Sequence, residues 1–97
     1  MLTYIVLGSF TEQGIRSVKD TTKRADAAKE AATRFGVTMR DIYWTQGQYD
    51  IVCVCEANDE TAISAFGLAL ASAGNVRFQT LRALNRDEMN GVLAKLG

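Results

Sequence analysis

Hydrophobic and polar residues alternate along four segments of the chain, and this alternation predicts a β-strand in each of them. The predicted strands are residues 2–10, 37–45, 49–56 and 76–84. Between the strands, apolar residues recur every three or four positions, which is typical of amphipathic helices. The predicted helices are residues 15–35, about 59–72 and 86–96. The order β-α-β-β-α-β predicts an α+β fold, the ferredoxin-like plait: a four-stranded antiparallel sheet with two helices on one face, followed here by a C-terminal helix.

The residue types at the ends of these segments agree with the predicted boundaries. Gly36 and Gly74 follow the two long helices, where a left-handed C-cap residue is expected. Residues 85–88 resemble a capping box that starts the last helix. Residues 11–14 are predicted to be a turn, and residues 20–22 are expected to interrupt the first helix.

The third predicted strand is apolar on both of its faces. Ile51, Cys53 and Cys55 lie on one face, and Val52 and Val54 lie on the other. Helices cover one face of such a sheet, so the second apolar face predicts a partner. The simplest partner is a second copy packed sheet against sheet, which closes a dimeric α+β barrel. The alternative is that the tail helix folds back over the open face within the monomer.

Length and composition favour one globular domain spanning residues 1–97. The chain has 97 residues, 47% of them hydrophobic, and 11 basic residues balance 11 acidic ones. This neutrality argues against a nucleic-acid partner, which requires a basic excess. No apolar run approaches the ~20 residues that span a membrane, and the N-terminus has no basic segment of a secretory signal. A cytoplasmic location is therefore expected.

The reactive residue types limit the possible chemistry. The chain has no histidine, which excludes Ser-His-Asp and Cys-His nucleophile systems and histidine-based metal sites. Cys53 and Cys55 lie on the same strand face, but two thiolates do not complete a zinc site, so both are expected to pack in the core. No metal and no cofactor are predicted.

The most unusual segment is residues 43–50, which combines three aromatic side chains and two amides around a predicted hairpin with Gly47 in its turn. Aromatic walls with a few polar groups suit a small-molecule pocket. In the alternative interpretation, the aromatic residues are packing anchors and Asp50 orders the turn. Arg77, on the last predicted strand, would attract a carboxylate or pair with Asp50. The candidate ligand-binding residues are Tyr4, Tyr43, Trp44, Gln46, Gln48, Tyr49, Asp50 and Arg77.

Seven segments of the chain carry motifs of one known family: residues 3–7, 10–16, 18–21, 23–24, 43–50, 74–77 and 80–83. Together these motifs resemble the GYD domain family, whose three letters fall on Gly47, Tyr49 and Asp50. The position at which the family often has proline is Thr22 here. The resemblance covers nearly the whole chain, implies a fold similar to dimeric α+β barrels, and leaves the function open.

Three functions fit these observations. The favoured hypothesis is a homo-oligomeric module that associates through its open sheet face and binds or senses a small molecule. The second is a cofactor-independent oxygenase or isomerase acting on a small cyclic or aromatic compound. In that enzyme Asp50 would be the candidate catalytic proton acceptor, and Arg77 or Tyr4 would polarise an oxyanion. The third is a purely structural or interaction domain.

Overall fold

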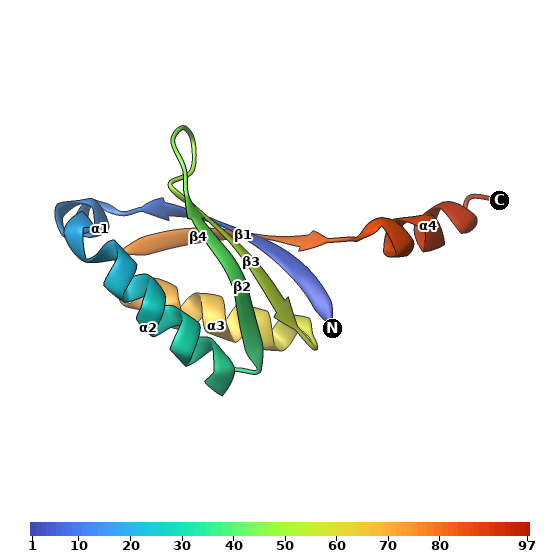
Figure 1. The fold of residues 1–97 in the computed structure, drawn as a ribbon, viewed down its shortest axis with the longest axis horizontal. Helices are drawn as coiled ribbons and strands as arrows, with labels where there is room; N and C mark the ends of the chain where they lie inside the picture. Colours follow the sequence, from blue (N-terminus) through green and yellow to red (C-terminus); the bar gives the residue numbers. More distant parts are fainter.

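The computed structural model describes all 97 residues. Its elements are β1 (Leu2–Phe10), α1 (Glu12–Arg16), the short 3-10 helix η1 (Val18–Asp20), α2 (Thr21–Arg34), β2 (Val37–Trp44), β3 (Ile51–Ala57), α3 (Glu60–Ser72), β4 (Val76–Ala83) and α4 (Arg86–Ala94). The strands form one antiparallel sheet in the order β2-β3-β1-β4, and both long helices lie on one side of it (Figure 1). The ferredoxin-like α+β plait predicted from the sequence is confirmed.

The core lies between the sheet and the two long helices. The rings of Phe35, after α2, and Phe66, in α3, have their centroids 5.9 Å apart, so they join the two helices. Strand residues alternate, with every second side chain buried beneath the helices. The buried residues of this core are Tyr4, Val6, Ala32, Val37, Met39, Ile51, Cys53, Cys55, Ala57, Ile63 and Phe66.

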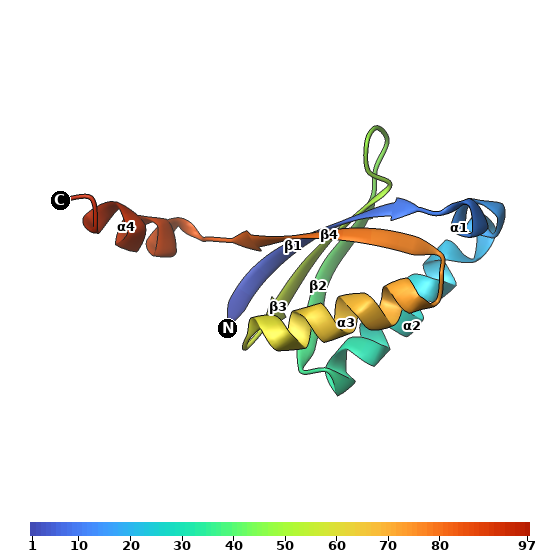
Figure 2. The same ribbon diagram turned by 180° about the vertical axis from the view of Figure 1, so that it is seen from behind.

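The other side of the sheet carries no helical layer, and Figure 2 shows both long helices on the opposite side. The strand register places Ile5 beside Val54 and Leu81, and Leu7 beside Val52. We call the surface formed by these five apolar residues the open sheet face. Both surfaces of the sheet are therefore apolar, as the alternation in the third strand predicted.

Residues 11–14, predicted as a turn, instead begin α1, so that prediction was wrong. Thr11 is the N-cap of this helix, and its side chain accepts a hydrogen bond from the Gly14 amide at 3.0 Å. The Thr11 amide donates to the Asn75 carbonyl at 3.0 Å, and the Thr11 hydroxyl donates to the Gly74 carbonyl at 2.5 Å. Gln13 Nε2 adds a hydrogen bond to the Asn75 side chain. These contacts attach α1 to the loop before β4.

The tail helix α4 continues the direction of β4 and projects away from the body (Figures 1 and 2). The molecule is accordingly long, with dimensions of 52 × 31 × 18 Å. Because α4 does not fold back, it leaves the open sheet face uncovered. The structure thus differs from the alternative in which the tail covers this face. None of the helices combines the length and the apolar composition that a membrane span requires.

Candidate functional site

The first two residues of the predicted site segment end β2, and residues 45–50 form the irregular loop between β2 and β3. Asp50 attaches this loop to the end of β1. The Asp50 carboxylate accepts a hydrogen bond from the Phe10 amide at 2.9 Å. The Asp50 amide donates to the Gly8 carbonyl, and the Asp50 carbonyl accepts from the Thr45 amide, both at 2.8 Å. Gly47 has φ +117°, a conformation that glycine adopts without strain. Asp50 therefore orders the turn, whatever further role it has.

The aromatic residues of this segment point to opposite sides of the sheet. Trp44 reaches the helix side, where its Nε1 donates to Thr21 Oγ1 at the start of α2 at 3.0 Å. Tyr43 precedes it in the same strand, lies opposite Val52 and is 59% exposed on the open side. The structure thus separates the two neighbouring aromatic side chains. The amide residues Gln46 and Gln48 are exposed in the loop.

Tyr49 and Arg77 share the open side with Tyr43. The Tyr49 hydroxyl donates to Gln79 Oε1 at 2.5 Å, so its side chain reaches from the loop to β4. Arg77 is exposed on β4, two residues before Gln79 on the same side. Together these residues form a polar and aromatic margin beside the open sheet face.

Tyr4 lies on the helix side of the sheet, away from Arg77. It is buried, and its hydroxyl is the one buried side-chain polar atom without a hydrogen-bond partner. The Arg82 guanidinium lies 5.8 Å from the centre of its ring, within the range of a cation–π contact. Tyr4 and Arg77 therefore do not converge on one oxyanion.

The two cysteines form part of the apolar core rather than a reactive pair. Burial raises the pKa of the Cys53 thiol to about 11. Burial, followed by the proximity of Cys53, raises the pKa of Cys55 to about 12. Both thiols are therefore protonated at neutral pH, which makes them poor nucleophiles. No group of three or more side chains of the kind that holds a metal ion gathers in the structure.

A feature missed by the sequence reasoning is a cavity of about 350 Å³ between α2, α3 and the sheet, here called the α2–α3 groove. Its walls are small residues of the two helices, and its floor is apolar. The signal in the sequence is the spacing of alanines in both helices, which by itself fits close helix packing equally well. The lining residues are Thr21, Arg24, Ala25, Ala27, Ala28, Ala31, Arg34, Met39, Ile42, Ile51, Cys53, Ala69, Leu70, Ala73, Asn75, Val76 and Phe78.

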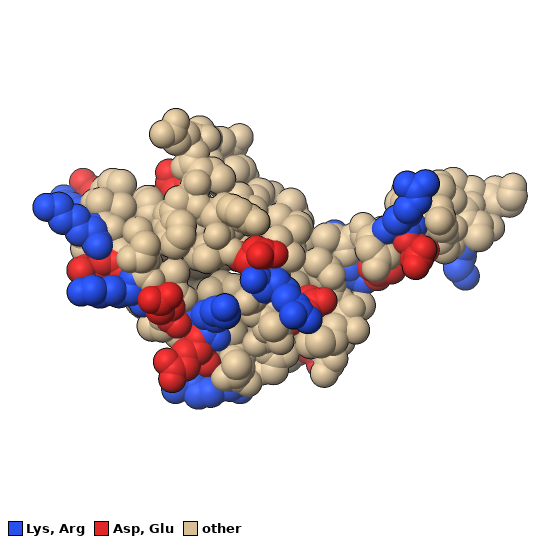
Figure 3. Space-filling model, in the orientation of Figure 1, with Lys and Arg blue, Asp and Glu red and all other residues tan.

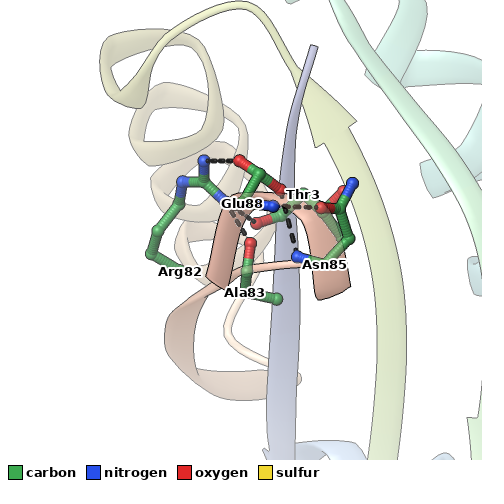
Figure 4. Close-up of polar contacts among 5 residues, drawn as sticks. All are labelled: Thr3, Arg82, Ala83, Asn85 and Glu88. Atoms are coloured by element: carbon green, nitrogen blue, oxygen red, sulfur yellow. Dashed lines mark hydrogen bonds and ion pairs between the residues drawn. The ribbon is translucent and has the colours of Figure 1, made fainter. Parts of the chain in front are cut away.

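A polar cluster fixes the direction of α4 (Figure 4). Arg82 donates to Glu88 Oε2 at 2.7 Å and also to the carbonyls of Thr3 and Ala83. Asn85 and Glu88 form the predicted capping box, each side chain accepting from the other residue's backbone amide. The hydrogen bond from Arg82 and the bond from the Asn85 backbone hold the pKa of Glu88 below its ordinary value.

Charged side chains are distributed without a large area of one sign. Figure 3 shows Lys and Arg interspersed with Asp and Glu along α1 and α2, next to a broad uncharged surface. This distribution agrees with the zero net charge of the chain.

Comparison with known proteins gives one family match. The family model described as "GYD domain" matches residues 4–93. A curated relative, the "Glutamine synthetase and cystathionine beta-lyase binding protein" of Thermus thermophilus, is 36% identical over 85 residues. The alignment covers 87% of this chain and 90% of that protein.

Two crystal structures share the fold. MtbAldR is 12% identical with a TM-score of 0.67, and the match covers 88% of this chain but only 54% of MtbAldR, so this chain spans about half of that protein. A Thermus thermophilus protein is 23% identical with a TM-score of 0.57, and the match covers 88% of this chain and 95% of that protein. At these identities the two likenesses show the fold alone.

Proposed function

This chain belongs to the GYD domain family, and we propose that it is a homodimeric binding module whose target is another protein. The observation that carries this proposal is the open sheet face, an apolar surface in the middle of the molecule that no part of the chain covers. Soluble monomers rarely expose a contiguous apolar surface of several hundred Å².

The whole side of the sheet that contains the open sheet face has a size that suits a second copy. Four strands of about eight residues, spaced about 4.8 Å apart with about 3.3 Å per residue, give a face of roughly 19 × 26 Å. Because side chains project from the plane of the sheet, the accessible area of this face is larger than its projection of roughly 19 × 26 Å. The accessible area therefore approaches the roughly 800 Å² that each partner buries in a standard interface. Face-to-face association would leave the α2–α3 groove and α4 outside the interface core.

We assign the contact with the target protein to α4. Met89, Val92 and Leu93 of α4, with Leu96 just after its end, are all more than 40% exposed, and they follow the i, i+3, i+4, i+7 spacing. This spacing is the one by which an amphipathic helix binds in the apolar groove of a partner. The capping box and the Arg82–Glu88 ion pair hold α4 in a preformed direction, which lowers the entropic cost of binding.

The relative from Thermus thermophilus supports a protein target, because it is named for binding glutamine synthetase and cystathionine beta-lyase. By this likeness, the proposed target of the present chain is a metabolic enzyme of the same kind. A catalytic role has less support. The Asp50 carboxylate is bonded to the Phe10 amide, and Tyr4 and Arg77 lie on opposite sides of the sheet.

Self-association is tested with Leu81→Asp, which places a charge on the open sheet face at a residue that is 41% exposed and therefore tolerant of substitution. Light scattering coupled to size-exclusion chromatography should give the mass of a dimer for the natural chain and of a monomer for this variant. The matched control is Leu68→Asp on the outer side of α3, where Leu68 is 72% exposed, and it should remain dimeric. A monomeric natural chain, or a dimeric Leu81→Asp variant, contradicts the proposed interface.

Target binding is tested with purified glutamine synthetase and cystathionine beta-lyase from the source organism, using biolayer interferometry. Leu93→Asp should remain dimeric and lose binding, because it places a carboxylate in the apolar stripe of α4. Asn90→Asp adds the same charge to the same helix beside that stripe and should bind like the natural chain. Equal binding by both variants removes α4 as the contact, and absence of binding to both enzymes removes the proposed target.

A further inference from the structure

The α2–α3 groove has the size of a site for a small organic molecule. Its volume of about 350 Å³ falls at the lower end of the range of roughly 300–1,000 Å³ that is usual for ligand pockets. At about 30 Å³ per water molecule, this volume equals that of about a dozen water molecules. A ligand with about a dozen non-hydrogen atoms has a similar size.

The deep part of the groove is apolar and offers no partner for a charge. Met39, Ile51 and Cys53 of the sheet form part of the floor, and alanines of α2 and α3 form the walls. Because an uncompensated charge is costly in such surroundings, this part of the groove suits an uncharged hydrocarbon or aromatic group.

The charged lining residues are all positive. Arg24 and Arg34 line the groove, and none of the 17 lining residues is an aspartate or glutamate. In a chain with equal numbers of acidic and basic residues, this is a local departure from neutrality. A ligand with an anionic group complements it.

The two arginines differ in what they already bind. Arg24 donates to the Ser17 carbonyl at 2.9 Å and to the Gly14 carbonyl at 3.5 Å, so its guanidinium is occupied in holding η1 and α1. Arg34 takes part in none of the three ion pairs and in none of the side-chain hydrogen bonds of the structure, although Glu30 precedes it by one helical turn. Ten helical residues separate the two arginines, about 15 Å at 1.5 Å per residue, so a small ligand reaches only one of them.

We propose that the α2–α3 groove binds a small monocarboxylic acid, with its apolar body between the alanines of the two helices and its carboxylate on the guanidinium of Arg34. A guanidinium and a carboxylate form two parallel hydrogen bonds, which fix the orientation of such a ligand. The groove lies on the side of the sheet opposite the open sheet face. The proposal is therefore independent of the dimer and of the target protein.

The test is a titration followed by amide NMR spectra, with hydrocinnamate and octanoate as probes and their primary amides as uncharged controls. Both acids should shift amide signals of α2 and α3, and their affinity should exceed that of the amides about tenfold or more, the effect of a charge-assisted hydrogen bond. Arg34→Gln should remove this preference for the acid. Arg16→Gln, at an exposed arginine of α1 outside the groove, should leave it unchanged.

A second pair of variants tests the volume of the groove rather than its charge. Ala69→Leu fills the groove from α3 at an exposed position and should abolish binding, whereas Ser64→Leu on the same helix lies outside the groove and should not. The spectra report the fold of each variant directly. Three results overturn the proposal: no binding of either acid, equal affinity for acid and amide, or shifts confined to the open sheet face or α4. Since Leu81→Asp alters only the opposite face, it should bind the acids normally, which separates this outcome from a failure of the proposed dimer.

Discussion

The close approach of α1 to the loop before β4 predicts that Gly14→Ala destabilises the protein strongly. A Cβ atom at Gly14 would lie 1.9 Å from the Asn75 carbonyl oxygen and 2.8 Å from its carbon. Since Cβ atoms essentially never approach another atom within 3.0 Å, α1 would have to move away by about 1 Å or more.

The cost follows from the contacts that this movement would break. The Thr11 amide and hydroxyl bond to the carbonyls of Asn75 and Gly74 at 3.0 and 2.5 Å, and α1 has no other attachment of this kind to the loop except through Gln13. Each hydrogen bond contributes about 1 kcal/mol, and overpacking adds roughly 1–3 kcal/mol. We therefore expect the free energy of unfolding to fall by about 3–5 kcal/mol, a large share of the 5–15 kcal/mol of a typical domain.

The matched control is Gly67→Ala in α3, where an added Cβ meets nothing within 4 Å. It should stabilise the protein by about 0.5–1 kcal/mol, because alanine restricts the unfolded chain and favours the helix. Urea unfolding followed by the fluorescence of Trp44, at one fixed protein concentration, measures both changes. A Gly14→Ala variant within about 0.5 kcal/mol of the natural protein would refute the steric argument.

Three further predictions concern titration and hydrogen bonding. With the thiol pKa of Cys53 raised to about 11 and that of Cys55 to about 12, the unfolded chain ionises at alkaline pH before the folded one. The free energy of unfolding should then fall by about 3 kcal/mol from pH 7 to pH 10, and an equal fall in the variant with alanine at both positions would contradict this. Because Arg82 lowers the pKa of Glu88, the Arg82–Glu88 contact should stay intact above the ordinary glutamate pKa and be lost as pH falls through the lowered pKa. Amide hydrogen exchange in α4 measures the resulting loosening of this helix, and Glu88→Gln should remove the pH dependence of that exchange. Trp44→Phe should lower the free energy of unfolding by about 1 kcal/mol through the lost bond to α2, with no change in oligomeric mass. Because this variant lacks the only tryptophan of the chain, its urea unfolding is followed by circular dichroism.

The sequence predicted the sheet and the long helices because each repeats a pattern over many residues. The helix α1 has only five residues, too few for a period to be visible. What stabilises it is the attachment of Thr11 to the Gly74–Asn75 segment, more than 60 residues away in the sequence. A tertiary contact of this kind leaves no local pattern, which explains why residues 11–14 were predicted to be a turn.

The placement of the candidate side chains was predictable only where it follows from strand alternation, and not where it depends on loop shape. Tyr43 and Trp44 are adjacent in β2, so the alternation of a strand already requires that they point to opposite sides. The path of Tyr49 to Gln79 depends on the irregular loop and could not be derived from spacing. The α2–α3 groove depends on how far apart two alanine-rich helices settle on the sheet, and the sequence pattern alone does not determine that separation.

Strand alternation also separates the two proposed binding surfaces within a single strand. In β3, Val52 belongs to the open sheet face, and the next residue, Cys53, lies in the floor of the α2–α3 groove. A carboxylate introduced at Val52 should therefore disrupt self-association while the groove still binds an acid. A larger side chain at Cys53 should reduce acid binding while the dimer persists. If both substitutions changed self-association and acid binding equally, the two surfaces would not be separate. The assignment of one function to each side of the sheet would then fail.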